Sequence, residues 1–126
     1  MAILNLQDEN TINRVWEKGF IEEGYDRDLF RKDAAGAWIS RSEYGNRESK
    51  FGWEIDHIYP TALGGDSDED NLRPMQWENN ISKGDNYPDY VAVVAADGSQ
   101  NINKQSSRTV NKKIQERLQQ LYSLLN

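Results

Sequence analysis

One stretch in the middle of the chain restricts the fold more than any other. Its first part, FGWEIDHI, alternates roughly between apolar and polar side chains, as a half-buried β-strand does. Pro60 ends this strand, because proline has no N–H group to donate to a strand ladder. Turn signals follow, and Gly84 is a typical helix end. The pattern predicts, in order, a strand over residues 51–58, a loop over 61–70, a strand over 72–76 and a helix over 77–84.

Further helices and strands are predicted on both sides of this unit. Apolar residues at helical spacing after Asp8 or Asn10 favour an N-terminal helix that stops near Gly24. Residues 99–107 are polar and are expected to be a mobile connection. The remaining predictions are a short helix or turn over 26–33, strands over 37–39 and 91–96, and helices over 8–23 and 107–126. Together they predict an α+β fold that forms a single domain over residues 1–126.

The C-terminal helix is predicted to be amphipathic and basic. Its apolar residues recur every three or four positions and form one stripe: Val110, Ile114, Leu118, Leu121 and Leu125. Residues 104–126 hold five basic residues and one acidic residue, which is a net charge of +4. We expect the stripe to pack on the domain. A homodimer or partner-protein contact through the stripe, and DNA contact through the basic side, are the alternatives.

The sequence contains no cysteine, which excludes disulfides and thiolate zinc sites. His57 is the only histidine, so no other imidazole can serve as a ligand or base. No segment approaches the ~20 apolar residues of a membrane span, and the N-terminal residues do not resemble a signal peptide. We therefore expect a cytoplasmic protein.

The net charge of −6 argues against a chain whose whole surface attracts nucleic acid. The charge is unevenly spread, because residues 104–126 carry +4 and the other 103 residues carry −10. A second basic group precedes the central unit: Arg27, Arg31, Lys32, Arg41, Arg47 and Lys50. An acidic run in the predicted loop, expected to be solvated, comprises Asp66, Asp68, Glu69 and Asp70. Local fields can therefore favour a polyanion although the total does not.

Several polar positions in the central unit form a pattern. Asp56 and His57 stand together at the end of the first strand, Asn71 precedes the second, and Asn80 lies three residues before Lys83. This pattern resembles the ββα-metal core of HNH endonucleases, over about 34 of the 126 residues. The Asp and Asn variant is similar to the HNH domain of RNA-guided CRISPR nucleases. The resemblance implies a ββα-metal (HNH) core over residues 51–86 with flanking N-terminal and C-terminal helices.

The resemblance also implies an activity, which is hydrolysis of DNA phosphodiester bonds to 5′-phosphate and 3′-hydroxyl ends. His57 would be the general base, and Asp56 and Asn80 would hold one Mg²⁺ or Mn²⁺ ion. The residue types suit these roles, since an imidazole with a pKa of about 6.5 accepts a proton near neutral pH and oxygen ligands suit Mg²⁺ or Mn²⁺ better than zinc. Adjacent residues on a strand face opposite ways, so Asp56 and His57 reach one phosphate only where the strand ends or bends.

The other pattern residues have supporting roles in this interpretation. Asn71 is expected to organise the active site by tying the loop to the backbone beside His57. Lys83 and Arg73 are candidates for phosphate contact, and each can equally be an ordinary surface charge. Asn79 adjoins Asn80 and could be the ligand in its place, although the spacing to Lys83 favours Asn80.

Two alternatives stay open at this level. A degenerate HNH scaffold could bind nucleic acid or protein without cutting it. An active nuclease could equally serve as a toxin, a defence effector, a homing enzyme or a repair enzyme, and the sequence does not separate these roles.

Overall fold

The central strand–loop–strand–helix unit forms where the sequence predicts it. In the computed structural model, which describes residues 3–124, β3 (Trp53–His57) and β4 (Leu72–Gln76) pair as an antiparallel hairpin. α2 (Trp77–Lys83) follows β4 directly and packs against both strands. The Gln76 side chain caps α2 by accepting hydrogen bonds from two backbone N–H groups, and Gly84, with a φ of 51°, ends it.

The remaining elements confirm an α+β fold. Within residues 3–124 the strands form three two-stranded antiparallel sheets, which pair β1 with β2, β3 with β4, and β5 with β6. The bounds are α1 (Glu9–Trp16), β1 (Phe30–Lys32), β2 (Trp38–Ser40), β5 (Asp89–Asp97), β6 (Gln100–Thr109) and α3 (Lys112–Tyr122). None of the helices in residues 3–124 is both long enough and apolar enough to cross a bilayer.

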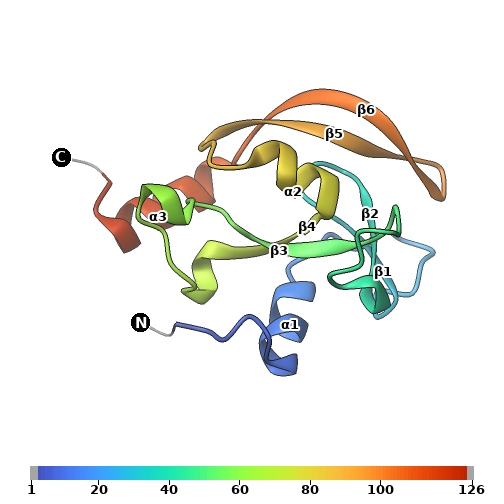
Figure 1. The fold of residues 1–126 in the computed structure, drawn as a ribbon, viewed down its shortest axis with the longest axis horizontal. Coiled ribbons are helices and arrows are strands. Elements are labelled where there is room, and N and C mark those ends of the chain that lie inside the picture. The colour runs from blue at the N-terminus through green and yellow to red at the C-terminus, as the bar shows by residue number, and fades with distance from the viewer. Residues whose placement is uncertain (1–2, 125–126) are drawn as a thin grey trace.

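The β3–β4 hairpin separates two hydrophobic clusters. α2 lies between the hairpin and the long β5–β6 ribbon, and α1 lies on the other side of the hairpin (Figure 1). On the α1 side, Trp16 and Val15 pack against Trp53, which is fully buried. On the α2 side, Met75 of β4 packs with Tyr90 of β5 and with α3. The hairpin is therefore held from both faces.

The prediction of one helix over residues 8–23 was wrong at its C-terminal end, whereas residues 26–33, predicted as a short helix or turn, contain a turn over 27–29 and the strand β1. α1 stops at Trp16, because Gly19 N bonds back to Trp16 O and turns the chain. Phe20 can then pair with Lys32, the last residue of β1. Residues 30–32 form a strand by pairing with β2, and the bridge to Phe20 extends this pairing by one residue on the other side. Periodicity within residues 26–33 reveals neither contact.

The prediction that residues 99–107 are mobile was also wrong. They belong to β6, which pairs with β5 from Asp97–Gln100 to Asp89–Thr109. A polar sequence can form this strand because the ladder satisfies its backbone groups and both faces need not be buried. Asn101 adds a side-chain link, since it accepts from Trp38 N and donates to Trp38 O. Residues 107–109 were predicted to begin the C-terminal helix, but they belong to β6. Of that helix's apolar stripe, Leu125 lies outside the described residues.

Candidate active site

One face of β3 is directed toward α2. Glu54 and Asp56 are two residues apart on the strand and therefore share a face. Asn80 Nδ2 donates to Glu54 Oε1 at 3.1 Å, and Lys83 Nζ lies 3.2 Å from Asp56 Oδ1. Asn80 and Lys83 on α2 thus contact Glu54 and Asp56 on β3, respectively. This register brings the proposed metal ligands Asp56 and Asn80 to the same side of the hairpin.

Asp56 is the centre of a buried charge cluster. Arg73 stands opposite it in the ladder and donates from Nε to Asp56 Oδ2 at 2.9 Å. The side chains of Asp56, Arg73 and Lys83 are 3%, 8% and 0% exposed. Burial lowers the pKa of Lys83, although its ion pair with Asp56 acts in the opposite direction. With both basic groups charged, the three side chains carry a formal charge of +1, so Asp56 is already neutralised by the protein.

His57 lies on the other side of the strand end. Its Nε2 lies 3.0 Å from Ser67 Oγ in the loop, and its carbonyl oxygen accepts from Lys83 Nζ at 3.1 Å. Burial lowers the pKa of the imidazole, and the carboxylate of Asp56 only partly offsets this. The neutral ring is therefore the dominant form near pH 7, as a general base requires. Asp56 and His57 are consecutive at the end of β3, but their side chains contact different partners.

Asn71 makes the loop contacts expected of it. The fully buried side chain accepts from Tyr59 N at 2.7 Å and donates to Tyr59 O and Asp66 O. It therefore closes the loop between β3 and β4 into a fixed shape. Gly65 allows this closure, because a Cβ atom there would lie 1.8 Å from Tyr59 O. The loop that carries Ser67 to His57 is thus held by one asparagine and one glycine.

The structure separates the two adjacent asparagines of α2. Asn79 is fully buried and makes four hydrogen bonds, accepting from Val93 N and Val94 N and donating to Val94 O and Asp33 Oδ2. It anchors α2 to β5 and has no free group for a ligand. Asn80 is half-buried and uses its amide nitrogen on Glu54, while its side-chain oxygen accepts no hydrogen bond from residues 3–124. Asn80 is therefore the residue available to a cation.

The donor atoms on this face suit an oxygen-preferring cation by their chemistry. Asp56 supplies a carboxylate, Asn80 a carbonyl oxygen, and Glu54 a second carboxylate that the sequence pattern did not single out. Burial raises the pKa of Glu54, but hydrogen bonds from Arg47 and Asn80 outweigh it, so the net pKa is lowered. In residues 3–124 no group of three or more His, Cys, Asp or Glu side chains is placed to hold a metal ion. A metal at Asp56 would also compete with Arg73 and Lys83.

The second basic group does not form a free basic surface. Arg31 is buried and donates to the carbonyls of Arg27, Glu17 and Gly19. Four others are paired with acids, in Lys32–Glu22, Arg41–Glu9, Arg47–Glu54 and Lys50–Glu78, and Arg27 alone is exposed without an ion pair to residues 3–124. The acidic run is likewise engaged, through Glu69–Arg14 and Asp70–Arg117. It is therefore not the simple solvated loop that the sequence predicts.

Two members of the site were missed from the sequence, Glu54 and the Arg73–Asp56 pair. Glu54 carries a weak signal, because it lies two residues before Asp56 in an alternating strand. The Arg73 pairing depends on strand register, which the sequence did not specify. Comparison with protein-family models, with characterised protein sequences and with solved structures finds no match for this chain.

Proposed function

We propose that this chain is a metal-dependent endonuclease of the HNH type that hydrolyses DNA phosphodiester bonds. The arrangement of one β-hairpin and the helix that follows it supports the proposal most. The unit carries Asp56 and His57 at a strand end, Asn71 in the connecting loop and Asn80 on the helix face toward β3. These are the positions that a ββα-metal core uses.

The proposed chemistry divides among these residues. Asp56 and the side-chain oxygen of Asn80 would hold one Mg²⁺ or Mn²⁺ ion, which supplies positive charge at the phosphate and at the leaving 3′-oxygen. In the tautomer that carries its proton on Nε2, His57 would donate to Ser67 Oγ at 3.0 Å, and Nδ1 would then take the proton of the attacking water. Asn71 keeps the loop, and with it Ser67, in place.

The two basic residues of the pattern have different positions in this scheme. Lys83 is fully buried, so we assign it to holding Asp56 and the His57 carbonyl rather than to a direct phosphate contact. Arg73 is bonded to Asp56 and also lines a surface cleft, so a phosphate contact is still proposed for it.

A binding module without catalysis is the second candidate. The ion pairs of Asp56 with Arg73 and Lys83 favour it, because they satisfy the carboxylate without a metal. A degenerate HNH scaffold of this kind would keep the hairpin and helix and bind DNA or protein through other surfaces.

Plasmid cleavage separates the two candidates. Supercoiled DNA is incubated with the protein in Mg²⁺, in Mn²⁺ and in EDTA. The nuclease proposal expects nicked or linear product with either metal and none with EDTA. DNA that stays supercoiled in both metals, with a protein that is folded by circular dichroism, supports the binding module instead.

A further inference from the structure

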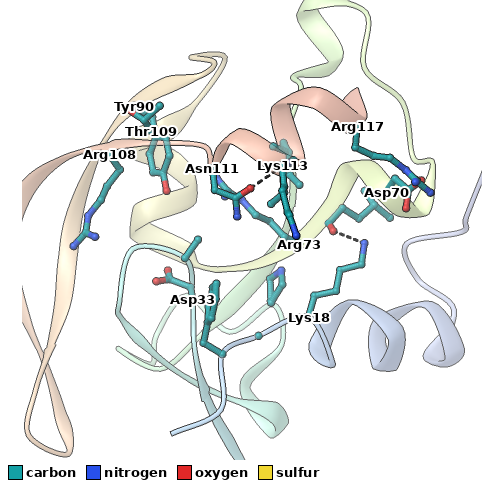
Figure 2. A pocket seen from close by; sticks show the side chains of 17 residues that line it. Lys18, Asp33, Asp70, Arg73, Tyr90, Arg108, Thr109, Asn111, Lys113 and Arg117 are labelled. Atoms are coloured by element: carbon teal, nitrogen blue, oxygen red, sulfur yellow. Dashed lines mark hydrogen bonds and ion pairs between the residues drawn. The ribbon is translucent and has the colours of Figure 1, made fainter. Parts of the chain in front are cut away.

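A cleft of about 590 Å³ opens beside β4, between the C-terminal end of α1 and the start of α3. Figure 2 shows Lys113 of α3 and Lys18, just after α1, on opposite sides of Arg73. The cleft volume falls in the range of small-molecule sites, which is roughly 300–1,000 Å³. None of the contacts proposed for hydrolysis uses this cleft apart from those of Arg73.

The lining of the cleft is basic. It contains five basic residues, Lys18, Arg73, Arg108, Lys113 and Arg117, and two acidic residues, Asp33 and Asp70. These charges sum to +3 in a chain whose total is −6. Asp33 is buried, and its oxygens accept four N–H hydrogen bonds, while Asp70 is paired with Arg117. The net positive charge therefore faces the cleft.

Some of these basic side chains make few or no hydrogen bonds or ion pairs with other groups in residues 3–124. Lys113 is exposed and makes no side-chain hydrogen bond or ion pair there, and Arg108 donates only to Ser106 Oγ. Nη2 of Arg73 is buried without a hydrogen-bond partner, although the side chain is 8% exposed and its guanidinium lies over the Tyr90 ring. Lys18 differs, since it donates to the carbonyls of Leu72 and Glu69. Arg108 and Lys113 are therefore the cations free to meet an anion.

The rest of the lining is apolar. It includes Ile58, Leu72, Pro74, Tyr90 and Ile114. Tyr90 is buried and its ring lies against the Arg73 guanidinium, so it adds to the apolar floor and does not offer an open face for stacking. A cationic rim around an apolar floor matches a ligand that has a phosphate at one end and a flat, weakly polar ring at the other.

We propose that the cleft binds a nucleotide unit of a single nucleic-acid strand. The phosphate contacts Arg108 and Lys113, and the base lies against the apolar floor. The second basic group offers no equal site, because all of its members except Arg27 are buried or paired with acids. A free nucleotide has the same chemistry, and the experiment distinguishes it from a strand.

The position of Arg73 connects this cleft to the proposed active site. Its Nε is bonded to Asp56, and the same side chain lines the cleft. A strand held there would approach the end of β3 from the Arg73 side. This link rests on the proposed function, whereas binding in the cleft does not need hydrolysis.

The test measures binding without cleavage. Fluorescence anisotropy of a labelled 12-residue oligothymidylate is followed in EDTA as protein is added, at several salt concentrations. The cleft variant is R108Q/K113Q. The matched control is K104Q/K112Q, which removes the same charge from exposed residues of β6 and α3 that do not line the cleft.

The cleft variant is expected to bind at least about tenfold more weakly, and the control within about twofold of wild type. Removal of one cation that touches a phosphate of a single strand flattens the salt slope by about 0.7, so the slope of the cleft variant alone should flatten by about 1.4. Equal weakening in the two variants, wild-type affinity in the cleft variant, or no binding by wild type each overturn the proposal.

Competition identifies the source of the ligand. Displacement of the oligonucleotide by dTMP shows that the cleft takes a free nucleotide as well, and its failure shows that a strand is required. Inorganic phosphate that competes as well as dTMP contradicts the base contact. Because EDTA is present, this binding is measured apart from hydrolysis: a protein that binds through the cleft but cuts no plasmid in Mg²⁺ or Mn²⁺ would reject the nuclease proposal and keep this one.

Discussion

Arg73 and Asp56 face each other across the β3–β4 ladder, and the 2.9 Å ion pair between them is buried from solvent. Lys83 adds a second cation on the other Asp56 oxygen. A buried carboxylate needs such partners, because an unpaired charge in this position would be very unfavourable. The same partners oppose a metal ion, so they set how tightly Asp56 can hold one.

The first prediction follows from this competition. Arg73→Gln removes one positive charge beside Asp56 while Lys83 still pairs with it, so Mn²⁺ affinity should rise by about tenfold or more, which corresponds to about 1.4 kcal/mol. Isothermal titration without DNA measures it. Arg108→Gln, which removes a charge that has no contact with Asp56, should leave the affinity unchanged. An Arg73→Gln protein that is folded and binds Mn²⁺ no more tightly would show that the ion pair does not compete.

The second prediction concerns the adjacent asparagines. Asn79→Ala removes four side-chain hydrogen bonds, three of them buried, so the free energy of unfolding should fall by roughly 3 kcal/mol. Asn80→Ala removes one half-buried hydrogen bond to Glu54 and should cost under about 1 kcal/mol. Urea unfolding compares them. Metal-dependent cleavage should be lost in Asn80→Ala, and a large loss of stability in this variant would make Asn80 structural instead.

The third prediction concerns the loop. Asn71→Ala removes the three hydrogen bonds that tie Tyr59 and Asp66 together, and should lower the free energy of unfolding by roughly 2–4 kcal/mol. Asn86→Ala, at an exposed position, is the control. Thermal and urea unfolding provide the measurement. Equal stability of the two variants would mean that the loop holds its shape without Asn71.

The fourth prediction concerns pH. Burial raises the pKa of Asp33, and four N–H hydrogen bonds only partly counteract it. A carboxyl whose pKa is higher in the folded state contributes stability below its unfolded pKa of about 4 and loses it as pH rises through the folded pKa. The free energy of unfolding of wild type, minus that of Asp33→Asn, should therefore fall as pH rises from about 4. A difference that grows with pH would show that folding lowers the pKa of Asp33 and would contradict this prediction. Asp97→Asn, at an exposed carboxyl, is the control.

Local patterns in the sequence were enough to predict the central unit. The alternation before Pro60, the strand at residues 72–76 and the helix closed by Gly84 all depend on neighbouring residues, and the structure contains each of them. β1 and β6 were not predicted, because their own sequences lack strand character and they form as partners of β2 and β5 in antiparallel hairpins. The Phe20–Lys32 pairing and the β5–β6 ladder compensate for sequences that lack strand character on their own.

In the candidate site, too, local features were predictable from the sequence and features that depend on tertiary packing were not. Asn71 and its loop were predictable, because the contacts are local. The burial of Lys83 and the partner of Arg73 were not, since both depend on how α2 and β4 lie against β3. A lysine beside a glycine at a helix end looks like a surface charge. Lys83 is nevertheless buried, because its ammonium group pairs with the buried Asp56 carboxylate.

The central claim is that His57 is the base of a metal-dependent hydrolysis. The most direct measurement is the rate of plasmid cleavage in saturating Mg²⁺ for wild type and for His57→Ala. Loss of a general base predicts a rate lower by about 10²–10⁴-fold, with the circular dichroism spectrum and the anisotropy of the bound oligonucleotide unchanged. No other histidine is present to replace it. Cleavage by a folded His57→Ala protein at the wild-type rate would contradict the account.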